Sequence, residues 1–115
     1  MILLTGDSGF IGSYLTSSLL AQGCDVHGID ILQKLDSRYP RETGNILDKD
    51  KLERAMQGVN TIIHLAAEHK DFGVPQERFY DINVDGTRAL LECASQRNVT
   101  KFVFFSSVAV YGSAV

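Results

Sequence analysis

Apolar residues follow two alternating patterns along this chain. Short, nearly continuous apolar runs predict buried strands, and they occupy residues 1–5, 25–31, 59–66 and 101–108. Between them, apolar positions three or four residues apart predict helices over residues 10–20, 48–56 and 79–97. The polar segments 32–44 and 68–75 show neither period and are interpreted as loops. The pattern therefore indicates alternating strands and helices.

This alternation predicts an α/β fold of the Rossmann type. Apolar strands separated by helices favour a parallel sheet covered on both faces, and right-handed crossovers give the spatial order 3-2-1-4 for about four strands. Residues 1–115 form one domain in this interpretation. The last strand would lie at an open edge although it is apolar, with no helix after it, so we expect an incomplete domain.

The apolar spacing also predicts which helical faces are buried. Asp48 is the expected N-cap of the second helix, and Gly23 is expected to end the first. The residues expected to share a face are Phe10, Ile11, Tyr14, Leu15 and Leu19 in the first helix, Leu52, Ala55 and Met56 in the second, and Phe79, Ile82, Leu90, Leu91 and Ala94 in the third.

Composition narrows the class of protein. The 115 residues are 44% hydrophobic and 22% charged, which excludes a disordered tail, a collagen-like fibre and a coiled coil. The net charge is −3 and there is no basic cluster, so neither nucleic acid nor a membrane surface is an expected partner. No basic, apolar leader precedes the first strand. We expect a cytoplasmic protein in which Cys24 and Cys93 stay reduced.

A glycine-rich turn between the first strand and the first helix carries the candidate chemistry. It reads Thr5-Gly6-Asp7-Ser8-Gly9-Phe10-Ile11-Gly12. Gly6 allows a sharp turn, Gly9 lets backbone approach a pyrophosphate, and Gly12 lets the helix pack closely on the sheet. The helix N-terminus would then face the phosphates. The alternative is a tight turn that binds no ligand.

Asp30 ends the second strand, eighteen residues after the last glycine of the turn. A carboxylate there can accept hydrogen bonds from both ribose hydroxyls of an adenosine and repel a 2′-phosphate, which predicts NAD rather than NADP. Arg38 and Arg41 lie in the following loop, where a 2′-phosphate could meet them, but a solvated loop is the favoured interpretation. His64, Glu68 and His69 lack the spacing of a zinc site, so no metal is expected.

The glycine spacing, Gly-x-x-Gly-x-x-Gly, resembles that of the short-chain dehydrogenases/reductases. More narrowly, the chain resembles their extended branch, the NAD-dependent sugar-nucleotide epimerases and dehydratases. The matching positions are the glycine turn, Asp30, Gly44-Asn45-Ile46, His64-Leu65-Ala66-Ala67, Asn83-Val84-Asp85-Gly86-Thr87 and Phe105-Ser106-Ser107-Val108-Ala109-Val110-Tyr111-Gly112.

The resemblance implies a set of NAD-binding residues. The N–H groups of Phe10 and Ile11 would meet the pyrophosphate, Asn45 and Ile46 would lie at the adenine, and Asn83 would support the backbone of the active site. The family more often has Asp at the position of Asn45, whose amide oxygen can still meet the adenine amino group. The full set is Gly6, Gly9, Phe10, Ile11, Gly12, Asp30, Ile31, Asn45, Ile46, Leu65, Ala66, Ala67, Asn83 and Ser106.

The resemblance also implies a reaction for the complete enzyme. NAD⁺ takes a hydride from a sugar carbon of a nucleoside diphosphate sugar, and Ser107 would bond the hydroxyl that is oxidised. The family's Tyr-x-x-x-Lys pair is absent, because Ser18, Thr43, Val84 and Val115 follow the four tyrosines. The resemblance further implies that the C-terminal strands and the substrate-binding region are absent from residues 1–115. We therefore expect no turnover from these residues alone. A stand-alone dinucleotide-binding or redox-sensing module is the alternative, and a homodimer is left open.

Overall fold

The computed structural model describes residues 1–34, 38–65 and 81–105, with the side chains of residues 81–83 excepted. In chain order the elements are β1 (Ile2–Thr5), α1 (Phe10–Ala21), β2 (Val26–Asp30), β3 (Arg41–Thr43), α2 (Lys49–Ala55), β4 (Thr61–His64), η1 (Asp81–Gly86), α4 (Thr87–Ser95) and β5 (Lys101–Phe104). The element η1 is a π-helical turn that leads directly into α4. None of the helices described is long and apolar enough to cross a membrane.

The five strands form one parallel sheet in the order β3-β2-β1-β4-β5. The predicted Rossmann-type parallel sheet is confirmed. With the observed strands numbered in chain order, the predicted spatial order 3-2-1-4 is confirmed too, and β5 follows β4. One segment needs correction, because the third strand is Arg41–Thr43, which sequence analysis placed in a loop, and Thr61–His64 lies on the other side of β1. Three polar residues at a sheet edge carry no apolar period, so periodicity could not reveal β3.

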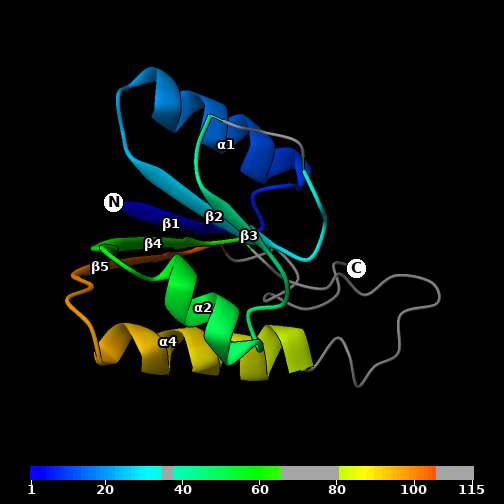
Figure 1. The fold of residues 1–115 in the computed structure, drawn as a ribbon, viewed down its shortest axis with the longest axis vertical. Coiled ribbons are helices and arrows are strands. Elements are labelled where there is room, and N and C mark those ends of the chain that lie inside the picture. The colour runs from blue at the N-terminus through cyan, green and yellow to red at the C-terminus, as the bar shows by residue number, and fades with distance from the viewer. Residues whose placement is uncertain (35–37, 66–80, 106–115) are drawn as a thin grey trace, which may run out of the picture.

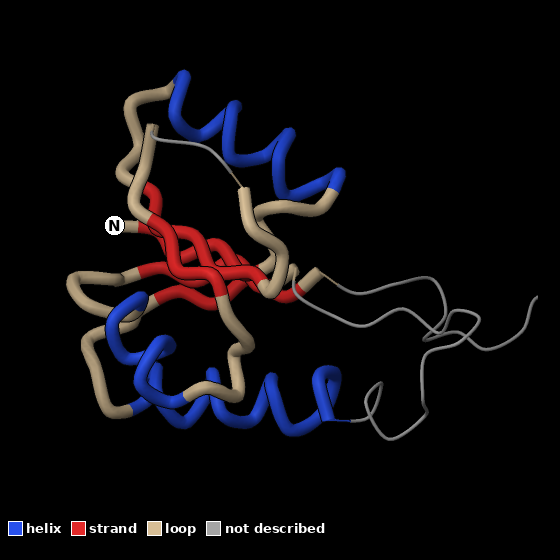
Figure 2. The backbone as a smooth tube through the Cα atoms, turned by 45° about the vertical axis from the view of Figure 1, so that its right-hand side comes forward, coloured by secondary structure: helices blue, strands red, loops and turns tan. Residues whose placement is uncertain are grey.

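The sheet lies between helices on both faces (Figures 1 and 2). Helix α1 covers one face, and α2 and α4 cover the other. The chain runs outward from β1 through β2 to β3, then crosses back to β4 through α2 on the opposite face. This reversal puts the topological switch point between β1 and β4. In open α/β sheets, ligands bind at the carboxyl ends of the strands beside such a point.

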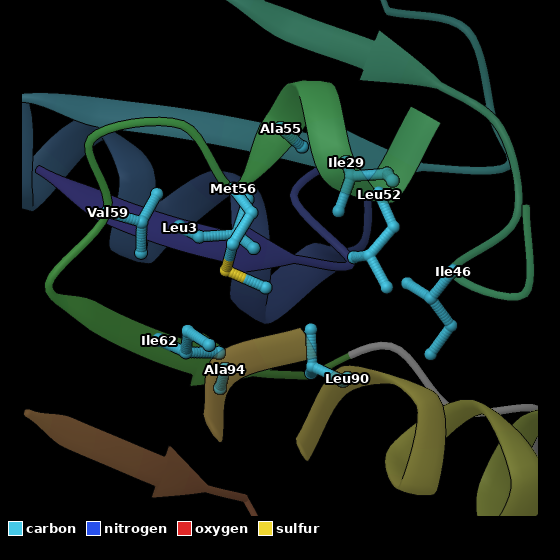
Figure 3. Close-up of a cluster of buried hydrophobic side chains, with 10 residues drawn as sticks. All are labelled: Leu3, Ile29, Ile46, Leu52, Ala55, Met56, Val59, Ile62, Leu90 and Ala94. Carbon is cyan, nitrogen blue, oxygen red and sulfur yellow. The ribbon is translucent and has the colours of Figure 1, made fainter. Parts of the chain in front are cut away.

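The larger hydrophobic cluster fills the space between the sheet and the α2–α4 face (Figure 3). Leu90 and Ala94 of α4 point into it, as predicted, but Leu91 is 47% exposed. Adjacent residues on a helix differ by about 100° in direction, so Leu91 cannot share the inward face of Leu90. The cluster consists of Leu3, Ile29, Ile46, Leu52, Ala55, Met56, Val59, Ile62, Leu90 and Ala94.

A smaller cluster lies under α1, and here the predicted helical face was partly wrong. Leu15 and Leu19 pack against it, but Phe10 is 91% exposed, and Ile11 and Tyr14 also face outward. The buried positions of α1 are Gly12 and Thr16. The helix start lies so close to the sheet that only small residues fit beneath it.

Helix ends follow the sequence signals. The Asp48 side chain accepts a hydrogen bond from the Lys51 N–H at 3.3 Å, which confirms it as the N-cap of α2. Gly23 has φ +81°, a conformation that favours glycine, just beyond α1.

Cys24 and Cys93 form no disulfide, as predicted.

Strand β5 forms an edge of the sheet with much of its apolar surface exposed. Val103, Phe104 and Phe105 all face solvent to a large extent. The expected open, apolar edge strand is thus present in the part of the chain that the structure describes. The predicted extension of this strand to residue 108 lies outside the described residues.

Candidate functional site

The glycine-rich turn lies at the carboxyl end of β1. Gly6 adopts φ +78°, and its N–H donates to the Ile29 carbonyl oxygen at 2.8 Å. A Cβ on Gly12 would lie 2.0 Å from the Gly6 carbonyl oxygen, so no side chain fits there. A Cβ on Gly9 would meet only that oxygen, at an ordinary 3.6 Å. Gly6 and Gly12 are therefore required by the fold, whereas Gly9 borders open space.

The N-terminus of α1 is left open by this turn. Its N-cap residue, Gly9, provides no side-chain hydrogen bond, and the first turn contains no acidic residue. Within the described segments, no group accepts a hydrogen bond from the N–H of Phe10 or Ile11. Unpaired N–H groups and the positive end of the helix dipole together favour an anion. The open N-terminus of α1 and the glycine turn before it fit the pyrophosphate of a dinucleotide.

Asp30 lies beside the turn, at the carboxyl end of β2. Its Oδ2 accepts from the Ser8 N–H at 3.0 Å, and its Oδ1 accepts from the Leu32 N–H at 3.1 Å. An ionised carboxylate offers about four acceptor sites, so about two remain for ribose hydroxyls. Ile31 and Leu32 expose apolar side chains next to it. The structure thus brings Asp30 and the glycine turn together, as predicted.

The segment Gly44-Asn45-Ile46 approaches the same edge. The Gly44 N–H donates to the Asp30 carbonyl oxygen at 2.8 Å. The Asn45 Oδ1 accepts from the Leu47 N–H at 2.9 Å, which leaves it one lone pair for an adenine amino group. Ile46 is only 4% exposed and belongs to the larger cluster, so it could reach a base only through its backbone.

Leu65 marks the carboxyl end of β4. Its N–H lies 3.1 Å from both the carbonyl oxygen and the Oγ1 of Thr5, which fixes the end of β4 beside β1. The backbone of Asn83 lies in η1. Outside the described residues lie Ala66, Ala67, Ser106, Ser107 and the side chain of Asn83.

A buried ion pair under the glycine turn is the feature that sequence analysis missed. The Asp7 carboxylate is fully buried, and Arg41 donates to it through Nε at 2.9 Å and Nη2 at 3.0 Å. The Tyr39 hydroxyl donates to the same carboxylate at 2.6 Å. This hydrogen-bonded pairing raises the pKa of Arg41. The favoured placement of Arg41 in a solvated loop was therefore wrong.

His64 connects the two strands of the switch point to α4. Its Nδ1 lies 2.6 Å from the Thr5 Oγ1, and its Nε2 lies 3.0 Å from the Thr87 Oγ1. Burial lowers the pKa of His64 to about 4, so the ring is neutral near pH 7. No three His, Cys, Asp or Glu side chains among the described residues lie close enough together to hold a metal ion.

Comparison with known proteins agrees with this geometry. Residues 2–115 match the sequence profile of the NAD dependent epimerase/dehydratase family. The chain belongs to this family. The resemblance to the sugar-nucleotide branch of the short-chain dehydrogenases/reductases is thereby confirmed.

Relatives within the epimerase/dehydratase family act on several substrates. The chain is 40% identical over 114 residues to N-acetyl-alpha-D-glucosaminyl-diphospho-ditrans,octacis-undecaprenol 4-epimerase of Escherichia coli O157:H7, a match that covers 96% of this chain and 33% of the relative. It is also 33% identical over 118 residues to a 3-beta-hydroxysteroid dehydrogenase of Mycolicibacterium neoaurum, covering 95% of this chain and 32% of that protein. The chain spans about a third of the length of these curated relatives.

Solved structures show the same fold with cofactor bound. A short-chain dehydrogenase/reductase superfamily protein of Agrobacterium tumefaciens, solved with NAD, superposes with a TM-score of 0.91 at 36% identity, covering 97% of this chain and 34% of that one. A dTDP-glucose 4,6-dehydratase of Streptomyces venezuelae, a double mutant solved with NAD, gives 0.87 at 34% identity, covering 99% and 41%.

Proposed function

We propose that this chain binds NAD along the carboxyl ends of β1, β2 and β4, as the cofactor-binding part of an enzyme that oxidises a sugar hydroxyl. One observation carries the proposal. The open N-terminus of α1 and the Asp30 carboxylate both lie at the carboxyl ends of the strands, where the Ser8 N–H donates a hydrogen bond to Asp30. A dinucleotide needs an anion site and a ribose acceptor in this arrangement. Membership of an NAD-dependent family supports it.

Each part of the site has a role in this proposal. The N–H groups of Phe10 and Ile11 bind the pyrophosphate, and Asp30 accepts from the two hydroxyls of the adenosine ribose. The negative charge of Asp30 would repel the 2′-phosphate of NADP. By the family resemblance, Leu65, Ala66 and Ala67 would line the ribose and pyrophosphate side of the cofactor, where small side chains leave it room.

The chemical step depends on residues beyond the described part. When bound, NAD⁺ supplies the hydride acceptor. By resemblance, the Ser107 hydroxyl bonds the substrate hydroxyl and holds it in position, and Asn83 supports the adjacent backbone. The Tyr-x-x-x-Lys pair that would take the proton is not among these 115 residues. We therefore expect the 115 residues alone to bind without turnover.

The substrate we propose is a sugar carried on a diphosphate. Solved neighbours include a UDP-glucose 4-epimerase of Thermotoga maritima with UDP-glucose bound, at 30% identity and a TM-score of 0.87. The relative from Escherichia coli O157:H7 is named for a sugar on a diphosphate-linked lipid carrier. The UDP-glucose bound to the Thermotoga maritima neighbour favours a nucleoside diphosphate sugar as the substrate.

The test is a swap of cofactor preference in the complete protein. Asp30→Ser removes the ribose acceptor and the negative charge, so NAD should bind about tenfold more weakly while NADP binding improves. Asp25→Ser is the matched control, because Asp25 is an exposed carboxylate that immediately precedes the other end of β2. Calorimetric titration with both cofactors measures the effect. Equal NAD affinity in wild type and Asp30→Ser would contradict the proposed site.

Turnover separates the enzyme from the alternative of a binding module. Ser107→Ala should lower the rate of sugar oxidation at least about a hundredfold and leave the NAD dissociation constant within about twofold. Wild-type protein that binds NAD but converts no diphosphate sugar would favour the module. Full activity in Ser107→Ala would remove that residue from the mechanism.

A further inference from the structure

The carboxylate that faces the proposed ribose site is held by two backbone groups. The Ser8 N–H donates to Oδ2 of Asp30, and the Leu32 N–H donates to Oδ1. Ser8 belongs to the glycine turn and Leu32 to the segment after β2. The direction in which Asp30 presents its free lone pairs therefore depends on how these two segments lie relative to each other.

Arg41 reaches both of those residues with one nitrogen. Its Nη2 lies 2.9 Å from the Ser8 Oγ and 3.1 Å from the Leu32 carbonyl oxygen. The Ser8 hydroxyl also donates to that carbonyl oxygen at 3.3 Å. Arg41 thus connects the two segments that supply the hydrogen bonds to Asp30.

Asp7 fixes the guanidinium in this position. It accepts from Nε and Nη2 of Arg41 in a two-point contact, and the Tyr39 hydroxyl donates to it as well. The carboxylate lies directly against β2, because a Cβ built on Gly28 would be 2.2 Å from the Asp7 Oδ2. A buried, two-point ion pair orients an arginine more strictly than an exposed pair can.

Strand β3 explains how Arg41 comes to this place. Its three residues pair in register with β2, with Arg41 opposite Gly28. The absence of a side chain on Gly28 leaves space for Asp7 and Tyr39, and the Asp7 Oδ2 in that space accepts from the Arg41 Nε. The short strand therefore holds the guanidinium directly below the glycine turn.

We infer that Arg41, held by Asp7, is a positioning residue that orients the Asp30 carboxylate toward the adenosine ribose through Ser8 and Leu32. The inference rests on the proposed function, because it needs Asp30 to bind that ribose. It predicts that Arg41 controls how much the 2′-hydroxyl contributes to binding. A merely structural role would lower stability without changing that contribution.

The experiment compares NAD with its analogue lacking the adenosine 2′-hydroxyl, in the complete protein. The ratio of the two dissociation constants should be about ten in wild type, the effect of one hydrogen bond to a charged group, and about one in Asp30→Ala. Arg41→Lys keeps the charge opposite Asp7 but cannot span Asp7, Ser8 and Leu32 together, so the ratio should fall to about three or less. Ser8→Ala, which removes one contact without burying a charge, should lower the ratio about twofold.

Arg54→Lys is the matched control. Arg54 donates a hydrogen bond to Glu42, the residue after Arg41, at 3.0 Å, and its side chain is 56% exposed. Among the described residues, this pair makes no hydrogen bond to the glycine turn. Its ratio should stay at the wild-type value. Melting temperatures of all variants show whether each protein is folded at the titration temperature.

Two results would overturn the inference, and they differ. If Arg41→Lys and Ser8→Ala weaken both ligands equally and keep the wild-type ratio, Arg41 acts only on stability, and the ribose contact of Asp30 stands. If the ratio is already one in wild type and unchanged in Asp30→Ala, the ribose contact fails and the role of Arg41 fails with it.

Discussion

The two sides of β1 use opposite chemistry at the carboxyl edge of the sheet. On the side of β2 and β3, charged groups dominate, with Asp7 buried against Arg41 and Asp30 presented at the surface. On the side of β4 and β5, the buried polar group is His64, whose lowered pKa keeps it neutral. The charged side suits the proposed binding of a ribose and a pyrophosphate, whereas on the other side the buried His64 ring of the described part carries no charge near pH 7.

The two edges of the sheet differ in the same way. Strand β3 consists of polar residues: the Arg41 side chain is buried against Asp7, and Glu42 forms an ion pair with Arg54 of α2. Strand β5 instead presents Val103 and Phe104, and Phe104 is 55% exposed. Charge protects an edge from further pairing, while an apolar edge favours it. Among the described residues, β5 is thus the more apolar of the two edges of the sheet.

The largest expected effect is on the charged side, from Gly12→Ala. The new Cβ would lie 2.0 Å from the Gly6 carbonyl oxygen and 2.9 Å from the Asp7 Cα, so backbone must move. We expect the free energy of unfolding to fall by about 3 kcal/mol and NAD affinity to fall at least about a hundredfold. Urea unfolding and calorimetric titration measure the two effects.

Gly9→Ala is the control for this substitution. Its φ of −72° suits alanine, and its Cβ would make only one ordinary contact. Stability should change by less than about 1 kcal/mol, while NAD affinity still falls, because the methyl group enters the space proposed for the pyrophosphate. Unchanged NAD affinity in Gly9→Ala would place the pyrophosphate elsewhere. Unchanged stability in Gly12→Ala would contradict the close packing of α1.

The charged side also shows where sequence-based prediction stops. The glycine turn and Asp30 were predictable, because their spacing relative to a strand and a helix is fixed by local geometry. The Asp7–Arg41 pair was not, since it joins residues 34 positions apart through a strand whose three residues carry no apolar period. The exposed face of α1 was missed for a related reason. Spacing showed that Phe10 and Tyr14 recur at helical intervals, but it did not show that the buried face is the one that carries Gly12 and Thr16.

The neutral side provides the smaller prediction, a loss of stability in mild acid. The pKa of His64 is about 4 in the folded state and about 6.5 when unfolded, so the unfolded chain binds the proton more readily between these values. The contribution is complete above pH 6.5 and is lost as the pH falls toward 4. From pH 7 to pH 5 this single group should lower the free energy of unfolding by about 2 kcal/mol. Urea unfolding at the two pH values measures the loss.

His27 allows the two sides to be separated. Burial lowers its pKa too, but the carboxylates of Glu42 and Asp7 oppose the shift, so it titrates in the same direction with less effect. His64→Gln keeps a polar side chain near Thr5 and Thr87 and removes the titration, so most of the difference between pH 7 and pH 5 should disappear. In His27→Gln most of that difference should remain. If instead His27→Gln removed most of the difference and His64→Gln left it, the titration of His27 would control stability in acid. The carboxylates of Glu42 and Asp7 would then not offset the effect of burial on His27.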